Sequence, residues 1–513
     1  MTRTDREVAI APDGAAYALP DDARRLAMLR RAEALAAKGP TVVVQGLGFV
    51  GAAVAAAVAA VRTPEGTPRY QVVGVDLPTP GGYWKVARLN EGTCPFDSPD
   101  PELAGLTRRA VLEDGNLCAA CSEEVYALAD VIIVDIPLDV EDRTEADPGR
   151  LKVDLAPFRS ALAAIGRWMK PGALVLVETT VPVGTTEKVA LPVLQEAFRA
   201  RGLAGTPLLA HCYERVMPGP RYLDSIRRFW RSFAGLDEAS TRRAQAFLES
   251  LIDTAAFPLT DLHDTRASEL AKLMENSYRA MNIAFLQEWT VAAEELGINL
   301  FAVVDSIRVR RGTHDNMRYP GFGVGGYCLT KDSLLAQWSL GHLFDLPVSL
   351  DLTLEALRVN YEMPLHTLRR TRELLGGTLD GRTIALCGIS YLAEVPDTRN
   401  TPAEAFLDAL QGAGAKAVCH DPWVRWWPER PQETIHEDLG LALAEADAVV
   451  FATPHAAYRR LDPGQLLAWT RPGTVIVDAM NVFTDEQAEA LRAGGRRIYG
   501  IGKGHWGRRG YHL

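Results

Sequence analysis

The sequence predicts an α/β protein with two Rossmann-like, doubly wound parallel-sheet domains joined by a helical domain with a long central helix. Short β-branched runs such as Thr41–Gln45 and Val131–Val134 alternate with longer helical stretches. Continuous apolar strands between helices are typical of parallel sheets covered on both faces. The same alternation begins again near Arg382, and between the two patterns residues 264–296 contain neither Pro nor Gly. That uninterrupted stretch predicts the long helix.

Length and composition limit the class of protein. At ~150 residues per domain, 513 residues suggest about three domains. Hydrophobic residues make up 47% and charged residues 23%, which excludes disordered, collagen-like and coiled-coil classes. The net charge of −10 argues against a nucleic-acid partner. No apolar run approaches the ~20 residues of a membrane span, and the seven scattered cysteines indicate a reducing compartment. We therefore expect a cytoplasmic protein without a membrane partner.

The order of the patterns predicts the domains. Residues 1–38 are polar and rich in Ala and Arg, with a helix over 21–38, and form an N-terminal extension. Strands at 41–45, 72–75, 131–134 and 174–177, with helices at 50–61, 153–169 and 186–200, form a first domain over 39–212. A helical domain spans 213–378. Strands at 384–387, 417–419, 448–452 and 475–477 form a last domain over 379–513.

A glycine loop follows the first strand and opens a helix. In this context Gly46 allows the tight turn, Gly48 lets the backbone approach a pyrophosphate, and Gly51 lets helix and strand pack closely. Asp76 ends the second strand, where a carboxylate accepts from an adenosine ribose and favours NAD over NADP. Asp76 lies farther along the chain from Gly46 than is usual in such units, and the insert at 63–70 accounts for the extra residues. The alternative is a tight turn without a ligand.

The segment 321–332, GFGVGGYCLTKD, combines four glycines with a cysteine, a lysine and an aspartate. A cysteine beside Lys331 has its thiolate favoured, so Cys328 is a candidate nucleophile. The alternative is a buried cysteine after a flexible loop. Cys118 and Cys121 form a CxxC, but no second pair follows at zinc spacing, and we expect no metal site.

Three further polar residues are candidates. Lys272 and Asn276 are four residues apart on the long predicted helix and share one face. Glu214 follows an apolar run, at a strand end where α/β sheets carry their sites. Taken alone, Lys272 could equally be a solvated lysine, and Glu214 with Arg215 a surface pair.

Together these segments resemble the UDP-glucose/GDP-mannose dehydrogenase family, from about residue 40 to about residue 485. The matching motifs occur in the family's order: GLGFVG (46–51), GVD (74–76), ETTVPVGTT (178–186), YERVMPG (213–219), ELAKLMENSYRAMNIAF (269–285), GFGVGGYCLTKDS (321–333) and DTRNTPAE (397–404). Several motifs resemble members acting on UDP-N-acetylmannosamine or UDP-N-acetylglucosamine, whereas GGYCLTKDS resembles UDP-glucose members.

The resemblance implies a four-electron oxidation of a sugar C6 hydroxymethyl to the uronic acid, with two NAD reduced. Cys328 would form a thiohemiacetal and then a thioester. Lys272 and Asn276 would stabilise the oxyanion, and Asp332 would position Lys272 or a water. Glu214 would be the general base for hydrolysis. Thr180 matches a threonine that holds water beside the cofactor.

The resemblance also implies two sets of binding residues and a homodimer or higher homo-oligomer built by the long helix. The expected NAD contacts are Gly46, Gly48, Phe49, Val50, Gly51, Asp76, Lys85, Pro137, Lys331 and Arg399. The expected nucleotide-sugar contacts are Arg215, Arg279, Asn282, Tyr319, Gly321, Phe322, Gly325 and Gly326.

Some positions depart from the family. Ile136 stands where a Thr usually precedes Pro137, and Thr330 replaces a usual Pro after the nucleophile. Leu392 and Met480 replace a common Lys and Arg near the substrate, so the identity of the nucleotide-sugar stays open. Two other activities stay open as well: a two-electron NAD dehydrogenase of the 6-phosphogluconate or hydroxyacid type, and a nucleotide-sugar-binding homologue without catalysis.

Overall fold

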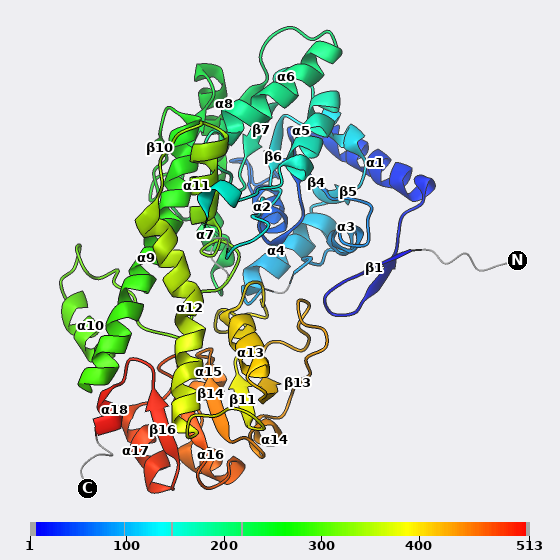
Figure 1. The fold of residues 1–513 in the computed structure, drawn as a ribbon. Helices are drawn as coiled ribbons and strands as arrows, with labels where there is room; N and C mark the ends of the chain where they lie inside the picture. The colour runs from blue at the N-terminus through cyan, green and yellow to red at the C-terminus, as the bar shows by residue number, and fades with distance from the viewer. Residues whose placement is uncertain (1–6, 97, 145–146, 217–218, 509–513) are drawn as a thin grey trace, which may run out of the picture. The chain divides into compact units, whose positions relative to one another are not determined.

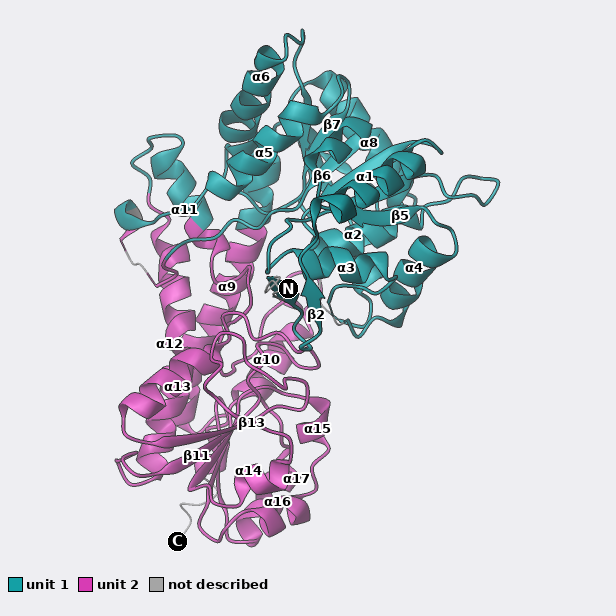
Figure 2. Ribbon diagram, turned by 90° about the vertical axis from the view of Figure 1, so that its right-hand side faces the viewer, with its two compact units in different colours: residues 1–141, 149–273, 335–348 teal, residues 142–148, 274–334, 349–513 magenta. Residues whose placement is uncertain are grey.

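The structure is a computed structural model that describes residues 7–96, 98–144, 147–216 and 219–508. Met217 and Pro218 of the YERVMPG motif lie outside the described residues. The chain divides into two compact units (Figure 2). The first takes in residues 1–141, 149–273 and 335–348, and the second takes in residues 142–148, 274–334 and 349–513. The division into four domains stays a prediction.

The described part of the first unit holds an eight-stranded sheet in the order β10-β9-β8-β7-β6-β3-β4-β5. Every neighbouring pair is parallel except β8 and β9. The strand order turns back between β3 and β6, which makes their carboxyl ends the switch point where such sheets bind ligands. The strands are β3 (Thr41–Gln45), β4 (Gln71–Val75), β5 (Leu117–Ala120), β6 (Val131–Val134), β7 (Leu174–Val177), β8 (Leu208–His211), β9 (Ser232–Gly235) and β10 (Thr260–Asp261).

Helices cover both faces of this sheet, which is why its strands are continuous apolar runs (Figure 1). Val42 and Val44 of β3 point into one core cluster and Val43 into the other. The first face is covered by α2 (Phe49–Ala59), α3 (Tyr83–Asn90), α4 (Pro101–Leu112), α7 (Tyr222–Arg227) and α8 (Glu238–Leu251). The second face is covered by α1 (Asp22–Ala36), α5 (Ala156–Trp168) and α6 (Leu191–Ala200).

The described part of the second unit holds a six-stranded, all-parallel sheet in the order β13-β12-β11-β14-β15-β16. Its order repeats that of strands β5 to β8 in the first sheet, with a switch point between β11 and β14. The strands are β11 (Thr383–Cys387), β12 (Lys416–His420), β13 (Ile435–His436), β14 (Ala448–Phe451), β15 (Val475–Asp478) and β16 (Arg497–Gly500). The helices around it are α13 (Pro402–Gly412), α14 (Leu439–Leu443), α15 (Ala456–Arg459), α16 (Pro463–Trp469), α17 (Asp485–Ala493) and α18 (His505–Arg508).

The predicted long helix is α9 (Thr265–Leu296), with 32 residues. At ~1.5 Å per residue it is about 48 Å long. It is followed by α10 (Leu300–Arg308), α11 (Asp332–His342) and α12 (Asp351–Leu374). Among the described residues, no helix combines the length and the apolar character that a membrane span requires.

The predicted α/β class with two Rossmann-like sheets and a helical central region is confirmed. Two local features differ from the expectation. The predicted helix over 186–200 begins with a π-helical turn, Thr186–Ala190, before α6. The polar N-terminal residues contain a hairpin of β1 (Val8–Ile10) and β2 (Ala16–Ala18), and Ala32 and Leu35 of α1 are buried in the same core as Val43.

Candidate active site

The surroundings of the three glycines in the GLGFVG motif explain why each position is a glycine. Gly46 has φ +94°, and a Cβ there would lie 2.3 Å from the Asp135 carbonyl oxygen. A Cβ on Gly51 would lie 1.9 Å from the Gly46 carbonyl oxygen. At Gly48 a Cβ would meet no heavy atom of the described chain within 4 Å. Gly46 and Gly51 are therefore required by packing, whereas Gly48 leaves open space directly before α2, at a helix end that favours an anion.

Asp76 follows β4 beside this loop. Its Oδ2 accepts from the Leu47 amide at 3.1 Å, and its Oδ1 accepts from the Leu77 amide at 2.8 Å. The Lys85 ammonium lies 3.1 Å from Oδ2. The structure thus places the predicted ribose acceptor at the glycine loop and pairs Lys85 with it. The open space at Gly48 and the tethered carboxylate of Asp76 fit a dinucleotide.

Asp135 was not singled out from the sequence. It follows β6 directly before Ile136 and Pro137, and the Gly51 amide donates to its carboxyl. Burial raises the pKa of Asp135 well above its usual value, and Glu178 and Glu214 raise it further. The sequence feature that could have identified Asp135 is a charged residue at the end of an apolar strand, in the segment VIIVD.

Glu214 and Lys272 are brought together in the first unit. Lys272 Nζ donates to the Glu214 carbonyl oxygen at 2.9 Å and to Glu214 Oε1 at 3.3 Å. Both side chains are buried. Glu214 Oε2 also accepts a short hydrogen bond from the Val216 amide. The predicted base and the predicted oxyanion-stabilising lysine therefore form one buried ion pair.

A second buried ion pair supports this region. Arg231 Nη1 lies 2.6 Å from Glu178 Oε1, and the same nitrogen is 3.4 Å from the Tyr213 carbonyl oxygen. Glu178 begins the ETT motif, whose Thr180 is also buried. Arg215 instead contacts the Tyr213 hydroxyl at 2.7 Å and the Trp230 carbonyl oxygen at 3.0 Å. Arg231 thus links the end of β7 to the segment that carries Glu214. Sequence reasoning missed Arg231 because nothing in RFWRSF separates it from a surface arginine.

In the second unit, the glycines before Cys328 pack against the protein itself. A Cβ on Gly321 would lie 2.8 Å from Met480 Sδ, and one on Gly323 would lie 2.5 Å from Pro402. The Gly325 position would clash with Tyr391 at 2.6 Å, and Gly326, with φ +87°, lies against the Tyr391 ring. The residue types in this segment are therefore required by packing as well as by any ligand.

Cys328 lies in a turn that leads into α11. Its carbonyl oxygen accepts from the amides of Lys331 and Asp332 at 3.1 and 3.0 Å. Cys328 is partly buried. Burial lowers the pKa of Arg399, but Asp397, Tyr391 and Cys328 raise it above its usual value. The position before a helix, with Lys331 and Arg399 close by, is of the kind that favours a thiolate.

Three predicted residues form a buried chain beside the cysteine turn. Lys331 Nζ lies 3.0 Å from Asp332 Oδ1, and Asn276 Nδ2 donates to Asp332 Oδ2 at 2.6 Å. All three side chains are buried. The structure thus pairs Asp332 with Asn276 and Lys331, and it pairs Lys272 with Glu214.

The remaining predicted substrate residues lie in the second unit. Asn282 Oδ1 accepts from the Arg318 amide at 2.9 Å, and the Tyr319 hydroxyl donates to Asp305. Burial lowers the pKa of Arg318, and the nearby Arg279 lowers it further. Phe322 is buried in the core of the second sheet, and its amide donates to Met480 Sδ at 3.0 Å.

Comparison with known proteins gives a consistent result along the chain. Sequence profiles of one family match three segments: its NAD binding domain over 40–244, its central domain over 266–361 and its UDP binding domain over 385–485. The chain belongs to the UDP-glucose/GDP-mannose dehydrogenase family. It is thus a member of a family of NAD-dependent nucleotide-sugar dehydrogenases, and the glycine loop and Asp76 lie in the NAD binding domain.

Individual relatives agree. The chain is 28% identical over 468 residues to UDP-N-acetyl-D-mannosamine dehydrogenase of Methanocaldococcus jannaschii, covering 91% of this chain and 97% of the relative. It is 27% identical over 458 residues to NDP-N-acetyl-D-galactosaminuronic acid dehydrogenase of Ralstonia nicotianae, covering 88% and 98%. The crystal structure of NDP-N-acetyl-D-galactosaminuronic acid dehydrogenase from Methanosarcina mazei Go1 matches with a TM-score of 0.76 and 29% identity, covering 93% and 99%.

The family's UDP binding domain repeats the geometry of the first switch point. Gly388 follows β11 with φ +97°, and a Cβ there would lie 2.5 Å from Thr453. Asp421 follows β12, and its Oδ2 accepts from the amides of Ile389 and Ser390 at 2.8 and 3.1 Å. Asp421 therefore has the place that Asp76 has in the first sheet, and applying the same rule to the segment CHD would have found it.

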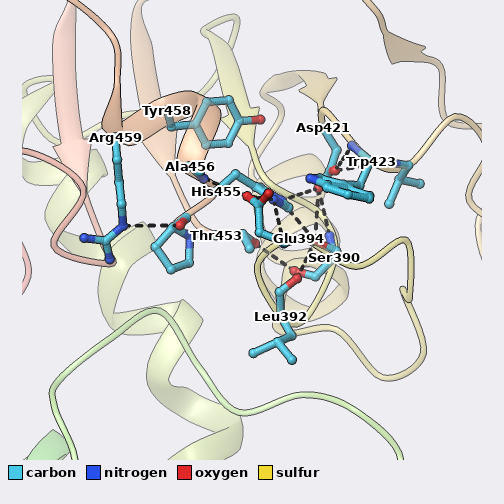
Figure 3. A network of polar contacts seen from close by, with 12 residues as sticks. Ser390, Leu392, Glu394, Asp421, Trp423, Thr453, His455, Ala456, Tyr458 and Arg459 are labelled. Carbon is cyan, nitrogen blue, oxygen red and sulfur yellow. Dashed lines mark hydrogen bonds and ion pairs between the residues drawn. The ribbon is translucent and has the colours of Figure 1, made fainter. Parts of the chain in front are cut away.

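The two switch points differ in the chain that connects the glycine to its helix. Helix α2 begins three residues after Gly46, whereas α13 begins only at Pro402. The buried ring of His455 supports the intervening loop (Figure 3). Its Nδ1 accepts from the Glu394 amide at 3.1 Å, and its Nε2 lies 3.1 Å from Ser390 Oγ and 3.2 Å from Asp421 Oδ2. Because Ser390 and Asp421 contact the same ring nitrogen, this group lacks the relay of a hydrolytic triad.

The glycine loop generates a prediction with a built-in control. We expect Gly51→Ala to destabilise the protein by about 1–3 kcal/mol, because its Cβ meets backbone. We expect Gly48→Ala to leave the melting temperature unchanged and to weaken NAD binding about tenfold, because its Cβ fills the open space before α2. Thermal unfolding and NAD titration measure the two effects. Equal losses of stability in the two variants would contradict the assignment.

The cysteines generate a second prediction. Burial raises the pKa of Cys118 and Cys212 to about 11, and that of Cys419 to about 12. Because iodoacetamide reacts with the thiolate, we expect Cys328 to be alkylated at least about tenfold faster than these three near neutral pH. Peptide mass spectrometry over a time course measures the rates. Equal labelling of Cys328 and Cys212 would contradict it.

Proposed function

We propose that the protein is an NAD-dependent nucleotide-sugar 6-dehydrogenase that carries out a four-electron oxidation through Cys328. The observation that carries the proposal is the cysteine turn. Cys328 lies in the turn that leads into α11, four residues before the helix begins and near Lys331 and Arg399, in a chain of this family. A two-electron dehydrogenase needs no nucleophile, whereas oxidation beyond the aldehyde needs a covalent adduct that can lose a second hydride.

The NAD binding domain supplies the cofactor contacts. Gly48 and the first amides of α2 would hold the pyrophosphate, and Asp76 would accept from the ribose hydroxyls. When bound there, NAD would supply the hydride acceptor for both oxidations. The overall reaction consumes the alcohol, two NAD and one water, and yields the carboxylate, two NADH and three protons.

Residues of the chain form the covalent bond to the sugar carbon, stabilise charge on its oxygen and accept a proton during hydrolysis. The thiolate of Cys328 adds to the C6 aldehyde to give a thiohemiacetal, and loss of hydride from that carbon gives a thioester. The Lys272 ammonium and the Asn276 amide stabilise negative charge on the C6 oxygen. Glu214 takes a proton from the water that hydrolyses the thioester, and the thiolate leaves. Lys272 and Asn276 are four residues apart on α9 and so share a face.

The substrate class follows from the UDP binding domain and from the named relatives. We infer a UDP-hexose or, as the relatives' names favour, a UDP-N-acetylhexosamine. The loop between Gly388 and α13 carries Leu392, which is exposed, where the resemblance expects a lysine. Met480 contacts the cysteine segment at Gly321 and Phe322. These two positions are where substrate contacts differ from the family's usual set.

A panel of UDP-, GDP- and dTDP-sugars followed by NADH absorbance tests the function. We expect two NADH per sugar with at least one UDP-sugar. We expect Cys328→Ala to lower turnover by at least about a hundredfold because no adduct forms. Cys94→Ala, another partly buried cysteine, is the matched control and should keep its activity.

Two other outcomes of this experiment would support a different function. One NADH per sugar, with full activity in Cys328→Ala, would indicate a two-electron dehydrogenase. Binding of a UDP-sugar by calorimetry without any NADH would indicate a nucleotide-sugar-binding homologue.

A homodimer through α9 is part of the same proposal. One stripe of this helix leaves large apolar side chains exposed: Met274, Tyr278, Phe285, Trp289 and Leu296. Their spacing of four and seven residues places them on one face. An exposed apolar stripe of this length is typical of a protein–protein contact, and a second copy of the chain, which the family resemblance implies, is the occupant we infer.

The stripe generates its own prediction. We expect Trp289→Glu to shift the protein from dimer to monomer at micromolar concentration in light scattering, because a charge on the stripe disfavours apolar contact. Val291→Glu is the matched control, since Val291 is also exposed but lies about 120° around the helix from Phe285. A monomeric native protein would contradict the proposal.

A further inference from the structure

The residues on either side of Cys328 contact one guanidinium group. Arg143 belongs to none of the sequence motifs, yet its Nη1 donates a short hydrogen bond to Thr330 Oγ1 and lies 3.3 Å from the Tyr327 carbonyl oxygen. Its Cζ is 5.1 Å from the centroid of the Tyr327 ring. Arg143 lies within residues 142–148, which are part of the second unit (Figure 2).

Thr330 gives this contact its geometry. The Thr330 hydroxyl donates to the Gly326 carbonyl oxygen at 2.8 Å, which closes the turn around Cys328. A hydroxyl has one proton and two lone pairs, so Thr330 can donate to Gly326 and accept from Arg143 together. The residue usual at this position in the family is a proline, which has no hydroxyl. The contact to Arg143 therefore depends on the Thr330 hydroxyl.

Positive charge converges on the same ring. Lys331 Nζ and Arg399 Cζ lie 4.7 and 5.7 Å from the Tyr327 centroid. Lys331 is paired with Asp332, and Arg399 with Asp397. Burial and the neighbouring Glu429 raise the pKa of Glu404 to about 7, although Arg430 and, less strongly, Arg143 lower it. Tyr391, next to the cysteine segment, has its pKa raised by burial.

We propose that Arg143 is a positioning residue for the Cys328 nucleophile. Its Nη1 contacts both the carbonyl oxygen before Cys328 and the hydroxyl two residues after it, and the stacking of its planar guanidinium on Tyr327 adds a third positive charge beside the turn. The turn then holds the sulfur in one place in a field that favours the thiolate. The inference rests on the proposed role of Cys328, but its test does not require turnover.

The test is the rate of iodoacetamide alkylation at Cys328 as a function of pH, without cofactor or substrate. We expect Arg143→Gln to slow alkylation near neutral pH about fivefold and to move the midpoint of the pH profile upward. We expect Thr330→Val, which removes only the hydroxyl, to act in the same direction. Since both changes break the contact between Arg143 and Thr330, the loss in the double variant should be smaller than the product of the two single losses. Arg143→Lys should recover less than half of the loss, because an ammonium lacks the planar group that stacks on the Tyr327 ring.

Controls separate positioning from general damage. Arg199→Gln removes an arginine from α6 whose exposed side chain pairs with Glu196, and it should leave the profile unchanged. Thermal unfolding and slow labelling of the buried Cys212 report whether each variant is folded. An unchanged pH profile in both Arg143→Gln and Thr330→Val would overturn the proposal. Multiplying effects in the double variant, or full recovery by Arg143→Lys, would overturn it too.

Discussion

Contact between backbones, at points where a β carbon does not fit, is the constraint on which this structure depends. In the first sheet Gly46 lies against the Asp135 carbonyl, and in the second Gly388 lies against Thr453. These contacts lie at the carboxyl ends of the strands at the switch point of each sheet, and they fix the path of the chain there. In the cysteine segment a β carbon is excluded by a side chain instead, because Gly323 lies against the Pro402 ring. Because the backbone is fixed at these points, the nearby amides and carboxylates are held in position as well.

Buried opposite charges are paired within each of the two units. Lys272 with Glu214, Lys331 with Asp332 and Arg231 with Glu178 are each ion pairs with little or no exposure. Removing one partner leaves a buried charge uncompensated, which costs several kcal/mol, roughly 3–5. The net charge of −10 therefore says little about the site, where cations are matched individually to carboxylates. Such pairing holds these side chains in fixed positions and offsets the cost of burying each charge.

The sequence predicted a feature correctly where its residue pattern fits only one kind of structure. Continuous apolar strands between helices, the glycine loop and the proline-free helix α9 were found because their patterns are long or local. Arg231 and Arg143 were missed because an arginine that folds inward has the same neighbours in sequence as a solvated one. The hairpin of β1 and β2 was missed because its strands have three residues each, too few to show periodicity. The pairing of Asp332 with Asn276, far apart in sequence, also needed the fold.

The two switch points share a strand order but differ in the length of chain between glycine and helix. The first connection is short, because Gly46 and Gly48 lie in the turn and Gly51 already lies in α2. The second has a long loop that ends at Pro402 and is supported from within by His455. Changes of sequence in that loop, such as Leu392, leave the sheet and its glycine contact intact. The fold thus separates a short turn that packing holds to one sequence from a longer loop whose side chains can be exchanged without disturbing the sheet.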